Sequence, residues 1–326
     1  MSEKQFNYGG QAVMEGVMMR GSKAMAVAVR HPDGHIVVHR EPLSKFMYAG
    51  WISRTPFLRG ITLLWDSLGL GVRSLLFSSN VAMEGEEGNR PATPREKPAR
   101  GEVAPTEVQN VFEGPLAWGT MALSFGLGMG LFLLLPAFAA GLIEGRLGIE
   151  SALAGNLIEG LIRLLLLVGY IWAVGRIPEI ARVFAYHGAE HKTIMAYEGN
   201  AALEPRAVIG YSMYHPRCGT GFLLIVVVIS VLVFSLLGQP PMALRLLSRL
   251  VLIPLIAGIA YEYLKFTARN QHLALVRALT APNLWLQRLT TREPDESMVE
   301  VAITALRFVL EAEQGAEIRT ETVSVG

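Results

Sequence analysis

One short stretch of the chain combines two histidines and a glutamate at a spacing that suits metal chemistry. In Tyr186–Lys192, YHGAEHK, His187 and His191 are four residues apart, so on a helix they share one face, where two imidazoles can hold one transition metal. Glu190 lies beside them. The order H-x-x-E-H is that of the inverted zincins, in which the histidines bind zinc and the glutamate acts as general base. The pattern therefore predicts a divalent-metal site, with zinc as the metal and Glu190 as the catalytic base.

A second motif supplies further ligands. HPRCGTG, residues 215–221, brings His215 together with Cys218, the single cysteine of the chain, and a thiolate favours zinc over magnesium or calcium. A zincin needs a third protein ligand, and Glu262 is another candidate because an ionisable residue near the end of an apolar segment is costly without a partner. The sequence leaves open which of these three residues completes the set. It also leaves open that the histidines are surface or interfacial residues with no metal.

Other charged residues in polar motifs are candidates for the same pocket. They are Glu15 and Arg20 in the Gly- and Met-rich segment 8–21, Lys192 and Arg217 beside the histidine motifs, and Arg292 and Glu293 in TTREPDES. Lys192 or Arg217 could stabilise negative charge that develops during hydrolysis. For segment 8–21 the favoured interpretation is a tight turn with a methionine packing surface. For residues 290–297 it is a helix start capped by Asp295 or opened by Pro294.

The composition indicates that these motifs belong to a membrane protein. Of the 326 residues 51% are hydrophobic and 17% charged, and the mean hydropathy is positive, which is unusual for a soluble domain. A net charge of +1 gives no electrostatic footprint of a dedicated nucleic-acid binder, so we expect no nucleic-acid partner. A lone cysteine cannot form an internal disulfide, and the functional parts are therefore expected to face a reducing cytoplasm.

Four apolar segments predict a transmembrane bundle over residues 116–264. They are Leu116–Ile143, Leu157–Gly175, Phe222–Leu237 and Leu244–Leu264, and about 20 apolar residues suffice to cross the hydrocarbon core. Lys and Arg concentrate before residue 116 and in the His-rich loop 179–217, whereas the loop 144–156 holds Arg146 alone. Because Lys and Arg are retained inside, both termini and the His-rich loop are predicted on the cytoplasmic side of a bacterial inner membrane.

Charged and small residues within these spans suggest how the helices meet. Glu159 and Arg163 form an i,i+4 pair near one end of a helix, and Arg245 and Arg249 are expected to snorkel to the interface. Gly126 and the glycine four residues later form a G-x-x-x-G pair, which favours close contact within the protein or with a second copy of it. The lipid bilayer is the expected surrounding, and a homo-oligomer or a membrane-complex partner is compatible with this pattern.

The N-terminal part before the bundle combines strand and helix patterns. Within residues 1–56, the runs 24–30 and 35–41 alternate around an Asp-Gly turn, which predicts a β-hairpin. Residues 57–82 are apolar but interrupted by charges at sevenfold spacing. This pattern predicts an interfacial or re-entrant helix rather than a span.

A linker and a tail complete the expected organisation. Residues 83–110 are rich in Pro, Glu and Arg and poor in bulky apolar residues, which predicts a mobile linker. The C-terminal tail, 265–326, predicts helices over 283–289 and 297–313, and we expect it to pack on the hairpin. The predicted fold is thus a polytopic α-helical membrane protein of about four spans with a mixed α+β cytoplasmic part.

Four motifs together resemble the YqhQ-like family of bacterial membrane proteins, a domain of unknown function numbered 1385. They are GGQAVMEGVMMRG, YHGAEHKTI, HPRCGTGFL and LTTREPDESMVEVAI, and they occur in this order over nearly the whole chain. The resemblance implies an uncharacterised membrane protein, described as a predicted metal-dependent enzyme. The positions that match the family's motifs are His187, Glu190, His191, His215, Cys218, Glu262, Glu15, Arg20, Arg292 and Glu293. The linker looks longer and more polar than the family leads us to expect.

Two functions from different classes fit these observations. The first is a zinc-dependent hydrolase at the membrane–cytoplasm boundary, acting on a lipid headgroup or a peptide bond. The second is a non-catalytic scaffold or accessory factor of a larger complex, such as the protein insertion and translocation machinery, with a closed zinc site. An open fourth coordination position distinguishes the two. A transporter or channel has less support, because ionisable residues are sparse in the middle of the clearest spans and no paired broken helices are evident.

Overall fold

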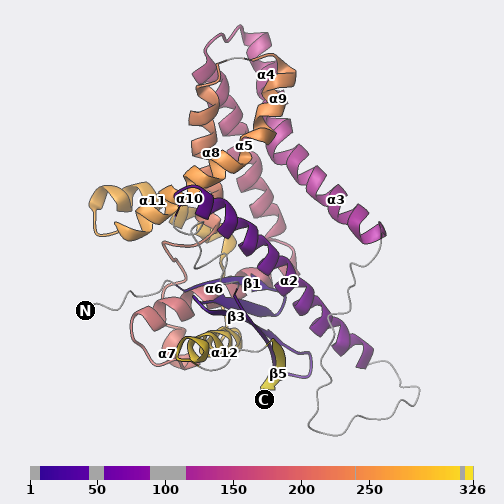
Figure 1. The fold of residues 1–326 in the computed structure, drawn as a ribbon, viewed down its shortest axis with the longest axis vertical. Coiled ribbons are helices and arrows are strands. Elements are labelled where there is room, and N and C mark those ends of the chain that lie inside the picture. Colours follow the sequence, from indigo (N-terminus) through magenta and orange to yellow (C-terminus); the bar gives the residue numbers. More distant parts are fainter. Residues whose placement is uncertain (1–7, 44–54, 89–114, 239, 316–319, 326) are drawn as a thin grey trace.

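The protein combines a sheet with covering helices and an elongated helical bundle (Figure 1). The computed structural model describes residues 8–43, 55–88, 115–238, 240–315 and 320–325. The five-stranded sheet is antiparallel, and its strand order follows the chain. Its strands are β1 (Gly9–Val13), β2 (Gly16–Arg20), β3 (Ala24–Arg30), β4 (Ile36–Pro42) and β5 (Glu321–Val325).

Two of the strands form the predicted hairpin, and three were not predicted. Strands β3 and β4 pair with Val27 opposite His39. Segment 8–21, interpreted as a turn with a packing surface, is a second hairpin, in which Gln11 lies opposite Met18. The last strand comes from the C-terminal tail and pairs with β4. The expected contact between the hairpin and the tail is therefore present, and it includes backbone pairing.

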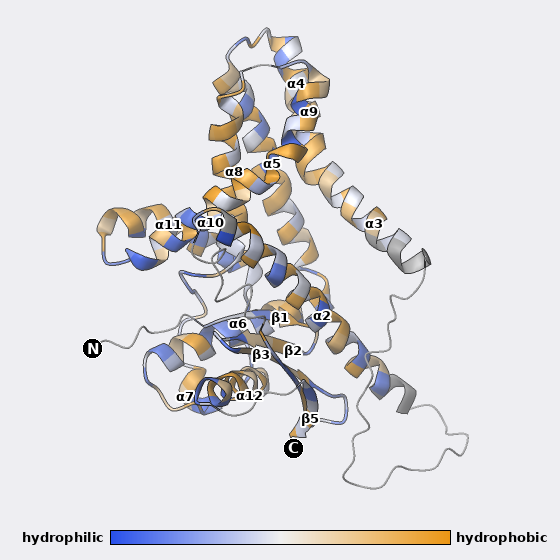
Figure 2. Cartoon of the chain, in the orientation of Figure 1, coloured by the Kyte–Doolittle hydropathy of each residue, from blue (hydrophilic) through white to orange (hydrophobic). Residues whose placement is uncertain are grey.

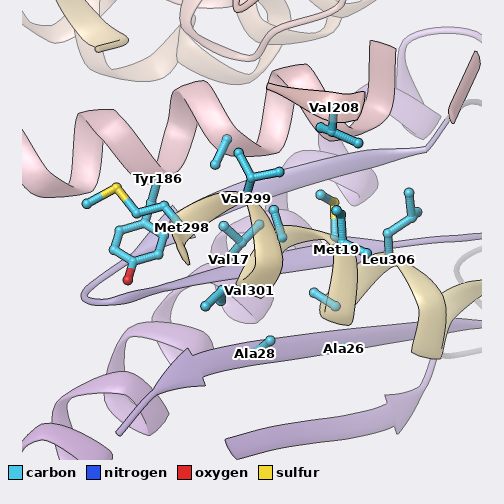
Figure 3. Packing of buried hydrophobic residues seen from close by; sticks show 14 of the residues in the cluster. Val17, Met19, Ala26, Ala28, Tyr186, Val208, Met298, Val299, Val301 and Leu306 are labelled. Atoms are coloured by element: carbon cyan, nitrogen blue, oxygen red, sulfur yellow. The ribbon is translucent and has the colours of Figure 1, made fainter. Parts of the chain in front are cut away.

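One face of the sheet packs against two helices, α6 (Pro178–Glu198) and α12 (Glu296–Glu313). Every second strand residue contributes: Val17, Met19, Ala26, Ala28, Ile36 and Val38. Figure 3 shows the small side chains of Ala26 and Ala28 near the valines of α12. Short side chains at these positions let a helix lie close to the strand, so this face forms a dense core.

The opposite face packs against α2 (Leu58–Gly88) through Leu70, Phe77 and Val81. The alternate strand residues Val13, Met18, Met25, Val27 and Val29 provide this second core. Because side chains alternate across a strand, the almost continuous apolar run of β3 is explained by burial on both faces.

The predicted interfacial helix corresponds to α2, which is longer than expected. Residues 83–88 continue the helix, so the predicted linker overlaps α2, and residues 89–110 lie outside the described part of the chain. By length and hydropathy Arg59–Glu84 meets the criterion for a membrane span, but the second half of α2 packs on the sheet. Its location at an interface stays a prediction.

The bundle contains the four apolar segments, two of which are interrupted. Its elements are α3 (Pro115–Met129), the π-helical η2 (Gly130–Leu134), α4 (Leu135–Leu147), α5 (Ala152–Val174), α8 (Thr220–Ser235), α9 (Met242–Val251) and α10 (Ile253–Arg269). The predicted span 244–264 is bent by 49° between α9 and α10, where Pro254 lacks the N–H that would continue the helix.

The surface of the bundle is apolar (Figure 2). Leu123, Phe125 and Leu165 are each more than 60% exposed, which suits contact with lipid. Among the described residues, three helices are long and apolar enough to cross a membrane, or four if the bent pair is one span. The predicted segment 222–237 corresponds to the shorter apolar helix α8.

The remaining polar segments are more helical than the sequence predicts. The His-rich segment 179–217, expected to be a loop, consists mainly of α6, followed by the short α7 (Pro205–Val208). The predicted tail helix 283–289 is the second half of α11 (Ala274–Thr290), and the helix predicted over 297–313 is α12. These helices connect the bundle to the sheet.

Candidate metal centre

Helix α6 brings its two histidines to the start of α8, at the junction of the sheet and the bundle (Figure 1). One ligand atom each of His187, His191 and Cys218 lie within 4.8 Å of one another. Nε2 of His187 is 3.3 Å from Sγ of Cys218, and the two imidazole rings have centroids 4.4 Å apart. The i,i+4 spacing thus places both rings on one helix face, as predicted, and adds the thiol from a second motif.

Main-chain carbonyls fix the tautomers of both histidines. Nδ1 of His187 donates to the carbonyl of Thr290 at 2.8 Å, and Nδ1 of His191 donates to the carbonyl of Met213 at 2.6 Å. A carbonyl oxygen can only accept, so each Nδ1 carries the proton and each neutral ring presents a bare Nε2. Histidines that bind metals in proteins are oriented in the same way by their second nitrogen.

Cys218 lies at the start of α8. It is buried and directly precedes Gly219, the N-cap of α8. The backbone N–H of Thr220 donates to Sγ at 3.4 Å, and Sγ donates to the hydroxyl oxygen of Thr220 at 3.2 Å. His187, His191 and Cys218 together offer two imidazoles and one sulfur as ligands, a set that suits zinc.

Glu190 lies beside this group, buried under strand β1. One carboxylate oxygen is 3.9 Å from Nε2 of His187, and the backbone N–H of Gly10 donates to the carboxylate. Burial raises the pKa of Glu190 to about 7, although His187 and this hydrogen bond oppose the rise. A Cβ at Gly10 would come within 2.8 Å of Glu190 Cγ, so the close approach of β1 requires glycine.

A second glycine lets α6 contact the loop that follows α11. A Cβ at Gly188 would lie 2.2 Å from the carbonyl oxygen of Arg292 and 3.3 Å from Pro294. The backbone N–H of Arg292 donates to the carbonyl of Phe184, and the carbonyl of Thr290 receives the His187 hydrogen bond. The TTREPDES motif therefore acts on the site through its backbone.

His215 lies next to the three-residue group without being part of it. Its ring centroid is 5.6 Å from that of His191, and its buried Nε2 has no hydrogen-bond partner among the described residues, although a Glu198 carboxylate oxygen lies 3.9 Å away. Burial lowers the pKa of His215. The side chain of Gln287 fixes the backbone of His215 with two hydrogen bonds of 2.9 Å. Its amide nitrogen donates to the His215 carbonyl, and its amide oxygen accepts from the His215 N–H.

The structure places Glu262 elsewhere, so we omit it from the ligand set. Its carboxylate accepts hydrogen bonds from Arg59 Nε at 2.7 Å and from the backbone N–H of Phe57 at 3.2 Å. Arg59 belongs to α2, and the ion pair ties this helix to α10. The sequence predicted that Glu262, near the end of an apolar segment, has a partner, and this partner is Arg59.

Three other candidate pocket residues are engaged in ion pairs near the site. Lys192 is buried, donates to the carbonyls of Ile209 and Tyr211 and pairs with Glu293 at 2.7 Å. Arg217 pairs with Glu198. These contacts join α6 to the segments that surround it. They leave Lys192 and Arg217 no evident role in stabilising negative charge on a substrate.

The N-terminal candidates and Arg292 also have structural contacts. Glu15, which has a φ of 50° in the turn between β1 and β2, accepts two hydrogen bonds of 2.6 Å from Arg182. These bonds hold the pKa of Glu15 below its usual value. Arg20 donates to Ser67 of α2 at 3.0 Å, and the guanidinium of Arg292 donates to the carbonyl of Gly175.

Comparison with known proteins shows the family of this chain. The family described as "Protein of unknown function (DUF1385)" matches residues 55–312. The chain belongs to this family. It is also 35% identical over 310 residues to "Uncharacterized protein YqhQ" from Bacillus subtilis (strain 168), a match that covers 95% of this chain and 94% of the relative. Neither description names an activity or a metal. No solved structure matches the chain.

Several residues that shape the site carry a sequence signal that we did not use. The glycines at 10 and 188 lie inside the quoted motifs. A glycine within a helix or strand often marks a place where another backbone or side chain comes close. Gln287 and Glu198 have no such signal. A second potential metal group, His31, Asp33 and His35, lies in the turn between β3 and β4. Its aspartate is exposed, and the local pattern of this segment predicted only a turn.

Proposed function

We propose that this DUF1385 member is an integral membrane protein that binds zinc through His187, His191 and Cys218 and acts as a metal-dependent hydrolase. The observation that carries the proposal is the pair of hydrogen bonds from the Nδ1 atoms to main-chain carbonyls. They leave Nε2 of each ring available as a ligand, and one ligand atom each of His187, His191 and Cys218 lie within 4.8 Å of one another. Metal-binding histidines in proteins are commonly oriented by a hydrogen bond from their second ring nitrogen in this way.

Glu190 is the group that fits the role of general base. A bound zinc ion supplies a Lewis acid that activates water and polarises a carbonyl or phosphoryl group. Glu190 contributes proton transfer, because its carboxylate lies 3.9 Å from a ligand nitrogen and the Gly10 N–H holds one side of it in place. We assign no charge-stabilising role to Lys192 or Arg217, since both are held in ion pairs.

The position of the site supports a substrate at the membrane boundary. Cys218 precedes an apolar helix of the bundle, and the two histidines belong to a helix that packs on the sheet. With the excess of Lys and Arg in this part of the chain, we propose that it faces the cytoplasm of a bacterial inner membrane with both termini. A lipid headgroup and a peptide bond at the membrane surface are the two substrate classes in reach.

A second candidate function rests on His215. Its Nε2 is buried and has no hydrogen-bond partner in the described part of the chain, and its ring is 5.6 Å from that of His191. A small rotation that brings this nitrogen to the metal would fill the fourth position. Such a closed site is structural, and the protein would then be a scaffold or accessory factor of a membrane complex, the second class of function that the sequence allows.

Cobalt substitution distinguishes these functions. Full-length protein in mild detergent is loaded with Co²⁺, and its visible spectrum is compared with those of Cys218→Ser and His215→Ala. We expect a sulfur-to-cobalt charge-transfer band that Cys218→Ser abolishes. Under the hydrolase proposal, His215→Ala leaves the spectrum unchanged, and an added anion such as cyanide alters it by occupying an open position. A spectrum that His215→Ala changes and cyanide does not would establish the closed site.

A further inference from the structure

A network of charged side chains is buried in the bundle at the end far from the sheet, where α4 and α9 lie (Figure 1). It consists of Glu144, Glu159, Arg163, Arg245 and Arg249, whose side chains are between 2% and 11% exposed. Burial of charged side chains is costly unless partners compensate it. Ionisable residues inside a membrane bundle often mark a functional site. The metal centre does not use this network, so a role for the network is independent of the proposed function.

The network contains more positive than negative charge. Glu159 accepts hydrogen bonds from all three arginines: from Arg163 at 2.7 Å, from Arg249 Nε at 2.9 Å and from Arg245 Nη2 at 3.2 Å. Glu144 accepts two more from Arg245, at 2.6 and 2.8 Å. Guanidinium groups stay protonated in proteins. Three arginines and two glutamates therefore leave one excess positive charge.

The other partners of the arginines are neutral. Arg249 donates to Asn156 Oδ1 at 2.7 Å and lies over the ring of Phe234 at 3.9 Å. Arg163 donates to Ser230 at 2.7 Å and to the carbonyl of Phe132 at 3.0 Å, within the π-helical turn η2. Such turns occur frequently at functional sites. These groups satisfy donors but do not neutralise the excess charge.

A small cavity lies beside the two arginines of α9. Its volume is about 10 Å³, and its lining includes Arg245, Arg249, Asn156 and Ala152. A cavity of roughly this size holds one water molecule. Ala152, the first residue of α5, and Glu144 also line this space.

A wider cavity lies next to this space. It has a volume of about 380 Å³ and shares Glu144, Pro240 and Arg245 with the small cavity. Glu150 lines the wider cavity alone and is exposed, so water screens its charge. Arg245 therefore borders both cavities.

We propose that the small cavity binds one monovalent, monatomic anion of the halide class, held by Arg245 and Arg249. Its charge matches the single excess positive charge of the network. Its size suits a cavity made for about one water molecule, which a phosphate group would exceed. Glu144 acts as an internal competitor, because its carboxylate engages both terminal nitrogens of Arg245.

The test is the chloride dependence of thermal unfolding, measured on full-length protein in detergent. Sodium chloride is compared with sodium gluconate at equal ionic strength, since gluconate is too bulky for the cavity. At chloride concentrations of roughly ten times the dissociation constant, we expect the unfolding midpoint of the wild type to rise by about 2 °C. Arg245→Gln removes the excess charge and should abolish the rise. Arg146→Gln, at an exposed arginine of the same region, is the matched control and should keep it.

A variant with the opposite sign keeps the proposal testable if Arg245→Gln does not fold. Glu144→Gln frees the guanidinium of Arg245 and raises the excess charge, so chloride should stabilise this variant more than the wild type. Broadening of the ³⁵Cl NMR signal by wild-type protein, reversed by bromide, should report the bound ion directly. Equal midpoints in chloride and gluconate for both the wild type and Glu144→Gln, without ³⁵Cl broadening, would overturn the proposal.

Discussion

Substitution of Gly188 by alanine tests whether α6 must lie against the loop after α11 for the metal centre to form. The new Cβ would lie 2.2 Å from the carbonyl oxygen of Arg292. Since real Cβ contacts essentially never fall below 3.0 Å, the helix and the loop must separate by roughly 0.8 Å. Overpacking of this kind costs about 1–3 kcal/mol, and the higher helix propensity of alanine contributes about 1 kcal/mol in the other direction. The expected net loss in the free energy of unfolding is about 0–2 kcal/mol.

The same shift acts on metal affinity, which is the more specific readout. The loop supplies the Thr290 carbonyl that orients His187, and ligand distances tolerate changes of only about 0.2 Å. Loss of such an outer contact lowers metal affinity about 10- to 100-fold. Competition with a chromophoric chelator measures this dissociation constant, and thermal unfolding measures stability.

A matched control separates this effect from glycine replacement in general. Gly69 lies in α2, and no atom comes within 4 Å of the place that a Cβ would take there. Gly69→Ala should therefore stabilise the protein by about 0.5–1 kcal/mol and leave metal affinity unchanged. If Gly188→Ala behaved like Gly69→Ala, with wild-type metal affinity and a higher unfolding midpoint, the argument that close packing forms the site would be refuted.

Three further predictions concern the surroundings of the site. The pKa of Glu190 is about 7 in the folded protein, against a usual value of 4.5. Between these two pH values the folded, metal-free protein holds a proton that the unfolded chain has lost, so the free energy of unfolding should fall by about 3 kcal/mol as the pH rises from 4.5 to 7. Denaturant titrations of Glu190→Gln should lack this fall, and an equal fall in the variant would contradict the assignment. Gly10→Ala places a Cβ 2.6 Å from the Met18 carbonyl oxygen and should lower the free energy of unfolding by about 1–3 kcal/mol. An unchanged thermal unfolding midpoint would show that β1 can move away from this contact. Gln287→Ala removes both hydrogen bonds to the buried His215 backbone. The free energy of unfolding, measured by chemical denaturation, should fall by about 2–3 kcal/mol. A loss below about 0.5 kcal/mol would show that these two hydrogen bonds do not stabilise the His215 segment.

Periodicity predicted the elements whose burial is regular along the chain. The β3–β4 hairpin has alternating residues around an Asp-Gly turn, and α12 has an apolar stripe, so both follow from local pattern. Strands β1 and β2 were missed because their Gly- and Met-rich sequence has low strand propensity, and partners on both faces stabilise them. Strand β5 depends on pairing with β4, a contact between distant parts of the chain that local pattern does not encode.

The histidine pair of the candidate site followed from spacing, whereas the choice among further ligands needed the fold. The i,i+4 rule places His187 and His191 together, but the sequence did not decide among three candidates for the further ligand: His215, Cys218 and Glu262. Arg59 of α2 holds Glu262, and a sequence gives no means to pair these residues. Arg249, which we expected to snorkel to an interface, instead turns inward to Glu159, because a buried carboxylate offers it a stronger partner than the membrane surface.

The measurement that tests the central claim most directly is the metal content of untagged, detergent-purified protein by inductively coupled plasma mass spectrometry. Wild-type protein is compared with the double variant His187→Ala, His191→Ala and with the control His31→Ala, His35→Ala, which also removes two histidines from a potential metal group. We predict about one zinc per chain in the wild type and in the control, and none in the His187→Ala, His191→Ala protein. Equal zinc in all three proteins, or zinc that disappears with His31 and His35 instead, would contradict the proposed site.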